Sequence, residues 1–161
     1  MTQKLIREIT GSSWDRYFIE LATLISTKSK DPSTKMGVVV VGEDNEILST
    51  GFNGFPRGVD EINYPERWER PDKYMWIVHA EANAVANAAR IGVSLKGSRM
   101  YMNYRPCPCS TCASLIIQAG VKKIIGPPAK FPGVGKGTHY DVDDITQEML
   151  DEVKIVRITV N

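Results

Sequence analysis

Short strand-like segments alternate with helix-like segments along most of this chain, and that alternation limits its fold more than any other feature. The segment 36–54 predicts two strands joined by a Gly-Glu-Asp-Asn turn, which makes a hairpin. Further strands are expected at 98–104, 121–126 and 154–160. Strands that alternate with helices are typical of a layered α/β domain with helices on both faces of one sheet, and the hairpin makes that sheet mixed.

Helical patterns appear in four segments, which are 12–31, 79–92, 112–120 and 143–152. The expected N-cap of the first helix is Ser12 or Ser13. Its expected apolar face consists of Trp14, Phe18, Leu21 and Ile25. The next two helices end at Gly92 and Gly120. Because the fourth helix lies between the last two strands, those strands are expected to be parallel, with a right-handed crossover. The sequence thus predicts a three-layer α/β domain around a mixed five-stranded sheet.

The bulk properties exclude several classes of protein. A chain of 161 residues suits one compact domain, and we expect a single domain over 1–161. No apolar stretch is long enough to span a bilayer, and no basic-then-apolar leader opens the sequence. A net charge of +1 gives no general attraction to polynucleotides. We therefore expect a soluble, cytoplasmic protein with no membrane and no polynucleotide among its partners.

Two predicted helix starts carry residues that bind metals. His79-Ala80-Glu81 opens one helix, and Cys109-Ser110-Thr111-Cys112 opens another. Two cysteines at that spacing can direct both thiolates to one point, where exposed backbone N–H groups favour negative charge. With His79 as a third ligand, zinc keeps its fourth position for water and brings the pKa of that water to about 7. Glu81 would lie near the metal and could take and return the proton.

All three cysteines of the chain lie in the segment 106–112, so one of them is left over. Counting from the preceding strand makes Cys107 the first ligand. Counting back from the following helix makes Cys109 the first ligand and Cys112 the second. We favour Cys109 and Cys112, because two ligands must share one helix start, and we treat Cys107 as a spectator.

His-x-Glu followed by Pro-Cys-x-x-Cys resembles the signature of zinc-dependent nucleobase deaminases. Other segments resemble deoxycytidylate (dCMP) deaminases in particular. They are Ser-Lys-Asp-Pro at 29–32, Gly-Phe-Asn-Gly-Phe-Pro-Arg-Gly at 51–58, the long insert within 59–84, and the segment 116–124. The resemblance covers residues 13–155, and the loop and the insert narrow it from the superfamily to the dCMP deaminase family.

The resemblance implies a cytidine-deaminase-like fold and hydrolytic deamination of dCMP to dUMP and ammonia, which supplies dUMP for thymidylate synthesis. It implies that a zinc-bound hydroxide attacks C4 of the cytosine ring, while Glu81 protonates N3 and helps the amino group leave. Some viral members carry a second, structural zinc, but here only Cys107 and His139 are left to hold one. We therefore expect one catalytic zinc per subunit.

Several residues are expected to contact the substrate. Asn53 matches the family's asparagine that hydrogen-bonds the nucleotide sugar, although an asparagine in a Gly-rich turn can simply satisfy its own backbone. The phosphate needs cationic or backbone donors, and lysines that could equally form a solvated face lie between the first helix and the first strand. They are Lys28, Lys30 and Lys35. Tyr104 is expected either on the base or sugar or in the core, and Ala80 is expected at the substrate.

The resemblance also implies regulation. Family members are typically hexamers, activated by dCTP with magnesium and inhibited by dTTP, with the effector site in the loop 51–58. The expected effector residues of this loop are Gly51, Asn53, Gly54, Phe55, Arg57 and Gly58. Phe55 and Arg57 would meet the effector's base and phosphates, or else form a packed aromatic and a surface arginine. Arg90 matches a position linked to subunit contact and regulation, although it can also serve as a helix C-terminal cation.

Other interpretations share parts of this pattern. A tRNA adenosine deaminase has the metal motif but usually lacks the long insert and has a more basic surface. A cytosine or riboflavin-pathway deaminase is a further rival of the same class. A binding module with a purely structural zinc, closed by a fourth ligand such as Cys107, has no use for Glu81. A thioredoxin-like redox pair leaves both His79 and Glu81 unexplained.

Overall fold

The structure, a computed structural model, describes residues 13–128 and 143–161. Its strands are β1 (Gly37–Val41), β2 (Ile47–Phe52), β3 (Arg99–Met102), β4 (Lys123–Gly126) and β5 (Val156–Thr159). Its helices are α2 (Trp14–Ser26), α3 (Lys73–Trp76), α4 (Ala80–Ile91), α5 (Ser110–Gln118) and α6 (Asp143–Glu152), with a short 3-10 helix η1 (Pro65–Trp68). Ser12 and His139 lie outside the described residues.

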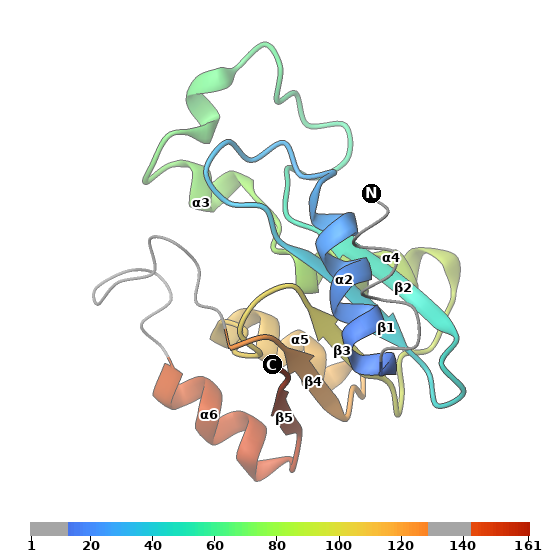
Figure 1. Cartoon of the computed structure of the whole chain (residues 1–161). Helices are drawn as coiled ribbons and strands as arrows, with labels where there is room; N and C mark the ends of the chain where they lie inside the picture. The colour runs from blue at the N-terminus through green and yellow to red at the C-terminus, as the bar shows by residue number, and fades with distance from the viewer. Residues whose placement is uncertain (1–12, 129–142) are drawn as a thin grey trace.

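The five strands form one mixed sheet in the order β2-β1-β3-β4-β5. The hairpin of β1 and β2 is antiparallel, as is the pairing of β1 with β3. The pairings of β3 with β4 and of β4 with β5 are parallel. Helix α2 covers one face of the sheet, and α4 and α5 cover the other (Figure 1). The prediction of a three-layer domain with parallel last strands is therefore confirmed.

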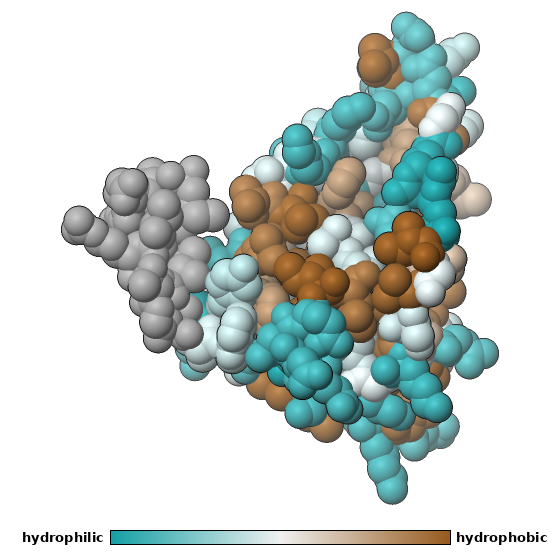
Figure 2. Space-filling model, turned by 90° about the vertical axis from the view of Figure 1, so that its right-hand side faces the viewer, coloured by the Kyte–Doolittle hydropathy of each residue, from teal (hydrophilic) through white to brown (hydrophobic). Residues whose placement is uncertain are grey.

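Strand β2 forms one edge of the sheet and carries exposed apolar side chains. Ile47 and Phe52 are 49% and 39% exposed, and Ile91 at the end of α4 is 68% exposed. Figure 2 shows hydrophobic side chains gathered on the side of the molecule where β2 and α4 lie. An exposed edge strand with apolar side chains offers a surface for association.

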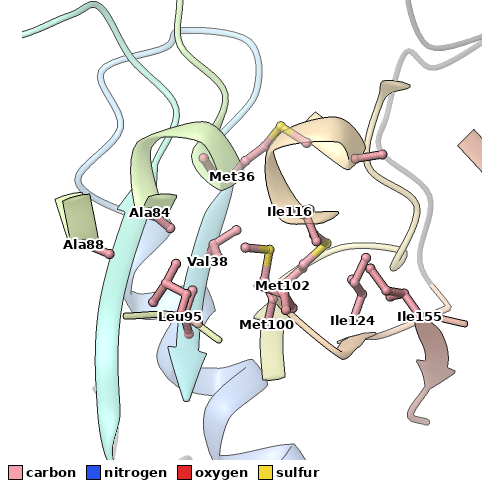
Figure 3. Packing of buried hydrophobic residues seen from close by; sticks show 14 of the residues in the cluster. Met36, Val38, Ala84, Ala88, Leu95, Met100, Met102, Ile116, Ile124 and Ile155 are labelled. Carbon is pink, nitrogen blue, oxygen red and sulfur yellow. The ribbon is translucent and has the colours of Figure 1, made fainter. Parts of the chain in front are cut away.

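The core lies on both faces of the sheet because β1 has valine at four successive positions, whose side chains point alternately to the two faces. On β1, Val38 and Val40 face α4 and α5, while Val39 and Val41 face α2. All four are fully buried, and burying a valine side chain contributes about 1.5–3 kcal/mol. Figure 3 shows how the side chains of the larger cluster fill the space between the sheet and its helices. Helices α4 and α5, whose first residues form the site described below, pack in this cluster.

Helix α2 begins where the sequence predicts. The Oγ of Ser13 accepts a hydrogen bond from the Arg16 N–H at 3.3 Å, which makes Ser13 the N-cap. Phe18 is buried as expected, but Trp14 is 56% exposed, so the predicted apolar face is wrong at Trp14. Trp14 is the first residue of the helix, and its ring stacks on Phe18 with the centroids 5.6 Å apart instead of entering the core.

Helix α4 lies close against β2 because both elements present small residues. Ala80, Ala84 and Ala88 recur at every fourth position and are buried. A Cβ atom on Gly51 would lie 2.2 Å from the carbonyl oxygen of Ala80, so only glycine fits there. Gly92 ends the helix with a φ of +76°, the left-handed conformation expected of this cap. This packing holds the start of α4 against the end of β2.

The segment between β2 and α4 contains η1 and α3, the first of which extends away from the sheet (Figure 1). Its end returns to the domain through an isolated antiparallel bridge between Gly54 and Val78. No helix within the described parts of the chain is both long and apolar enough to cross a membrane.

Candidate metal centre

Three potential metal ligands come from two helix N-termini. His79 is the N-cap residue of α4, and Cys109 is the N-cap residue of α5. Both have extended backbone angles, with ψ of 156° and 164°, so the chain turns sharply into each helix after the ligand. Cys112 lies in the first turn of α5, on the side that faces His79.

The ligand atoms lie at a spacing that suits a tetrahedral metal. The Sγ atoms of Cys109 and Cys112 are each 3.4 Å from Nδ1 of His79, and all three ligand atoms lie within 4.8 Å of one another. With Zn–S near 2.3 Å and Zn–N near 2.0–2.1 Å, a sulfur and a nitrogen on one tetrahedral zinc are about 3.6 Å apart. One imidazole and two thiolates are a zinc donor set, so these residues fit the ion.

Hydrogen bonds and charges within the cluster shift the pKa values of the three ligands. A hydrogen bond from the Cys112 thiol lowers the pKa of Cys109 to about 4, although burial opposes this shift. The same bond, together with burial, raises the pKa of Cys112 above its usual range. Burial lowers the pKa of His79, but its hydrogen bond with Cys109 and the charge of Glu81 outweigh burial, and the pKa lies above 6.5. Metal binding to this set therefore releases protons.

Glu81 stands in the first turn of α4, two residues after His79, and is 3% exposed. Burial raises the pKa of its carboxyl group, although the charge of the nearby His79 opposes the shift. Its Oε2 atom is buried without a hydrogen-bond partner among the described residues. A buried carboxylate oxygen without a partner is costly, which fits an atom that meets a bound water or substrate.

Tyr104 lies in the core cluster and is 3% exposed. Burial and the charge of Glu81 raise the pKa of its hydroxyl group well above 10, so the hydroxyl stays protonated. Of the two places expected for Tyr104, the structure shows the core, near enough to Glu81 for the two groups to interact electrostatically.

Cys107 is separate from the cluster. Its Sγ lies 4.0 Å from Nη1 of Arg157, and its N–H donates to the carbonyl of Arg105 at 2.7 Å. These residues line a surface pocket of about 370 Å³. The structure thus brings Cys109 and Cys112 to His79 and leaves Cys107 on the far side of the loop.

Asn53 is buried and holds the neighbouring loop. Its Oδ1 accepts from the Met36 N–H at 2.8 Å, and its Nδ2 donates to the Thr34 carbonyl at 2.9 Å and to Asp31 Oδ2 at 3.2 Å. Both amide N–H donors are therefore used, and a second lone pair remains on Oδ1.

The three predicted phosphate lysines are exposed. Lys30 pairs with Glu61, and Lys35 donates to the Ser29 carbonyl. Among the described residues, the buried lysine is instead Lys73, which pairs with Asp31. Sequence reasoning assigned no role to Lys73, because a lysine in a polar insert is normally solvent-exposed. The sequence feature that could have pointed to Lys73 is Asp31 of the Ser-Lys-Asp-Pro segment, an acid that can pair with a buried lysine.

The predicted effector residues are divided between packing and surface. Phe55 stacks on Trp68 with the centroids 4.4 Å apart and lies 6.2 Å from Trp76. Arg57 is exposed, and its Nη2 donates to Asn87 Oδ1 at 2.5 Å. Arg57, Asn87 and Arg90 line one surface pocket of about 400 Å³ beside β2.

The glycines of this loop differ in role. Gly51 and Gly54 are buried, whereas Gly58 is exposed and has a φ of +83°. Ala80 is fully buried. The glycines and Ala80 therefore set the path of the backbone around the site. Side-chain contacts with a ligand would come from neighbouring residues.

Comparison with known proteins gives a consistent result. Residues 12–126 match the family model described as the cytidine and deoxycytidylate deaminase zinc-binding region. The chain is 38% identical over 143 residues to the deoxycytidylate deaminase of Homo sapiens, which covers 85% of this chain and 72% of the human protein. It is 39% identical over 123 residues to a probable deoxycytidylate deaminase of Drosophila melanogaster, covering 70% of this chain and 58% of that protein.

Among solved structures, the dCMP deaminase of cyanophage S-TIM5 in complex with dCMP and dUMP has a TM-score of 0.69. The sequence identity is 24%, and the match covers 99% of each chain. This likeness shows the fold.

Proposed function

The chain belongs to the cytidine and deoxycytidylate deaminase family, and from that premise we propose that it hydrolyses dCMP to dUMP and ammonia as a single catalytic domain. The observation that carries the proposal is the cluster of His79, Cys109 and Cys112 beside the buried carboxylate of Glu81. The deoxycytidylate deaminases among its relatives support the choice of substrate.

In this proposal His79, Cys109 and Cys112 would hold one zinc ion, and as only three protein ligands they would allow water to bind it as well. Zinc at such a site acidifies water and so supplies a nucleophile at neutral pH. The protein would orient that chemistry, because α4 packs closely on β2 and α5 packs against α4.

Glu81 is the proton carrier. Its Oε2 accepts a proton from the attacking water and delivers it to N3 of the cytosine ring. Glu81 then takes the remaining proton from the hydroxyl group added at C4 and passes it to the exocyclic amino group, so that the C4–N bond breaks, ammonia leaves and the C4 carbonyl forms. The buried position of Glu81 keeps bulk water from competing for the proton.

Substrate recognition falls to the residues around the cluster. The remaining lone pair of Asn53 Oδ1 would accept from a sugar hydroxyl. Ala80 would act through its backbone N–H at the start of α4, and Tyr104 through its contact with Glu81. The phosphate would be met by the exposed lysines Lys28, Lys30 and Lys35.

We also propose that dCTP, with magnesium, activates the enzyme and that dTTP inhibits it. Arg57 and Arg90 line one pocket and offer two guanidinium groups to a triphosphate. Gly51 and Gly54 connect this loop to the start of α4 through the close approach to Ala80 and the bridge to Val78. An effector that shifts the loop would therefore shift the site.

A homo-oligomer, a hexamer in this proposal, would cover apolar side chains that the single chain exposes. Ile47 and Phe52 on the edge strand β2 and Ile91 at the end of α4 are examples of these exposed side chains. Light scattering coupled to size-exclusion chromatography measures the mass directly, and a monomer at micromolar concentration would contradict this part of the proposal.

The test of the reaction is ammonia release from a panel of dCMP, dCTP, deoxycytidine and cytosine, with the products identified by chromatography. We expect dUMP from dCMP at a kcat/KM well above that of the other three. Preference for cytosine or deoxycytidine would replace the nucleotide assignment, and absence of turnover with all four would contradict the proposed function.

A further inference from the structure

Lys73 and Asp31 form a buried ion pair between segments 42 residues apart. Lys73 Nζ lies 2.9 and 2.8 Å from the two carboxylate oxygens of Asp31, and 2.7 Å from Ser33 Oγ. The two residues are 2% and 1% exposed. A buried pair of this kind contributes little net stability, because desolvation offsets the attraction, but it fixes the geometry of the groups it joins.

Asp31 is the centre of a network that reaches Asn53. Its Oδ1 accepts from the N–H groups of Ser33 and Thr34 at 2.8 and 3.1 Å. Its Oδ2 accepts from Nδ2 of Asn53 at 3.2 Å. The carboxylate that Lys73 holds in place therefore helps to set the orientation of the Asn53 amide, together with the Met36 N–H and the Thr34 carbonyl.

Lys73 is also close in sequence to the metal ligand His79. Lys73 opens α3, and the residues after α3 lead to Val78 and His79. Gly54 and Val78 exchange two backbone hydrogen bonds, of 3.1 and 2.8 Å. Each of these residues is adjacent in sequence to a site residue, Gly54 to Asn53 and Val78 to His79. The Asp31–Lys73 pair and the Gly54–Val78 bridge therefore both connect the region around Asn53 with the segment that leads to His79.

We propose that Asp31 and Lys73 are a positioning pair that fixes the sugar-binding Asn53 relative to the metal ligand His79. Neither side chain touches the reacting atoms. The consequence for the reaction rests on the proposed function, because it assumes that dCMP is the substrate and that Asn53 meets its sugar. Loss of the pair should then weaken the binding of dCMP and leave the chemical step nearly intact.

The main variant is the double substitution Asp31→Asn and Lys73→Met, which removes both charges and leaves no unpaired charge in the core. The amide oxygen that Asp31→Asn introduces can still accept from the N–H groups of Ser33 and Thr34, so the local turn is kept. The matched control is Arg99→Met, which also removes a cation with two hydrogen bonds. Arg99 holds Gly42 and Asn45 at the opposite end of β1.

The first measurement is amide hydrogen exchange of the zinc-loaded proteins, which needs no substrate. We expect faster exchange at Met36, Gly54 and Val78 in the double variant than in wild type or in Arg99→Met, with zinc content unchanged. Wild-type exchange rates at these amides, or an equal increase in Arg99→Met, would overturn the positioning role.

The second measurement is steady-state turnover of dCMP. For the double variant we expect a KM raised by about tenfold or more and a kcat within about threefold of wild type, since a lost polar contact in binding has that size. An unchanged KM would show that the pair is only structural and would overturn the proposal. If wild type itself does not deaminate dCMP, the proposed function fails, and hydrogen exchange alone decides whether the pair fixes these segments.

Discussion

The Sγ of Cys109 lies 3.4 Å from Nδ1 of His79, although 30 residues separate them in the sequence. The contact exists because α4 and α5 pack side by side on one face of the sheet and begin at the same end of the molecule. The Sγ of Cys112 also lies 3.4 Å from this nitrogen, whereas the Sγ of Cys107 lies 4.0 Å from Nη1 of Arg157.

This geometry predicts how each cysteine affects zinc content. We expect Cys109→Ser and Cys112→Ser to lose zinc, because each removes one of the three ligands. Cys107→Ser is the matched control and should retain about one equivalent per chain. Metal analysis by mass spectrometry of the purified proteins decides the matter, and a zinc-free Cys107→Ser protein would show that the wrong pair has been assigned.

Glu81→Gln should keep zinc and fold but lose deamination by about three orders of magnitude or more, the scale of a lost general acid and base. The amide nearly matches the carboxylate in shape but cannot carry the proton. Glu43→Gln, an exposed change in the hairpin turn, is the control and should retain wild-type kcat. Turnover by the Glu81 variant at a tenth of the wild-type rate would remove Glu81 from this role.

Arg57→Ala should weaken dTTP inhibition and any dCTP activation while sparing most of the maximal rate at saturating dCMP. An arginine that contacts phosphate contributes enough to raise the inhibition constant by about tenfold or more. Arg16→Ala, an exposed substitution on α2, is the control. The test is a dCMP titration with and without each nucleotide. An inhibition constant equal to that of wild type would exclude Arg57, and a wild type indifferent to both nucleotides would exclude the regulation itself.

The Asp31–Lys73 pair predicts a dependence of stability on pH. Burial raises the pKa of Asp31, but hydrogen bonds from Lys73, Ser33 and Thr34 outweigh it, and the pKa lies below 3.8. The unfolded chain therefore binds this proton more readily than the folded chain. The stabilisation is complete above a pH of about 4 and is lost as the pH falls through the folded-state pKa.

Urea unfolding of wild type and of the Asp31→Asn, Lys73→Met double variant at several acidic pH values measures this effect. We expect the free energy of unfolding of wild type to fall more steeply below a pH of about 4. The zinc ligands titrate in both proteins, so the difference between the two curves isolates Asp31. Parallel curves would contradict the prediction.

The sequence predicts the local elements of this fold well and its long-range polar contacts poorly. The hairpin of β1 and β2 and the glycine end of α4 depend on neighbouring residues, so their patterns are visible in the sequence. The burial of Lys73 depends on Asp31, which lies 42 residues away, and no periodic pattern encodes that meeting. The sequence leaves two roles open for Asn53, a sugar contact or a hydrogen bond to its own turn, and it does not show that the amide also bonds Met36 and Thr34.

The metal cluster could be predicted for a different reason. His79 and Cys109 are each placed by a helix start, and a helix start is a local feature with a chemical signature. Counting from the strand and counting from the helix give different first ligands, and the helix count favours Cys109 and Cys112 because two ligands share one helix start. The structure brings these two cysteines to His79.

Zinc reconstitution tests the central claim most directly. Chelator-stripped protein is titrated with zinc, and dUMP formation from dCMP is measured at each step. We predict negligible activity without metal and a linear rise that saturates at about one equivalent of zinc per chain. Full activity in the stripped protein, or a rise that continues to a second equivalent, would contradict a single catalytic zinc held by His79, Cys109 and Cys112.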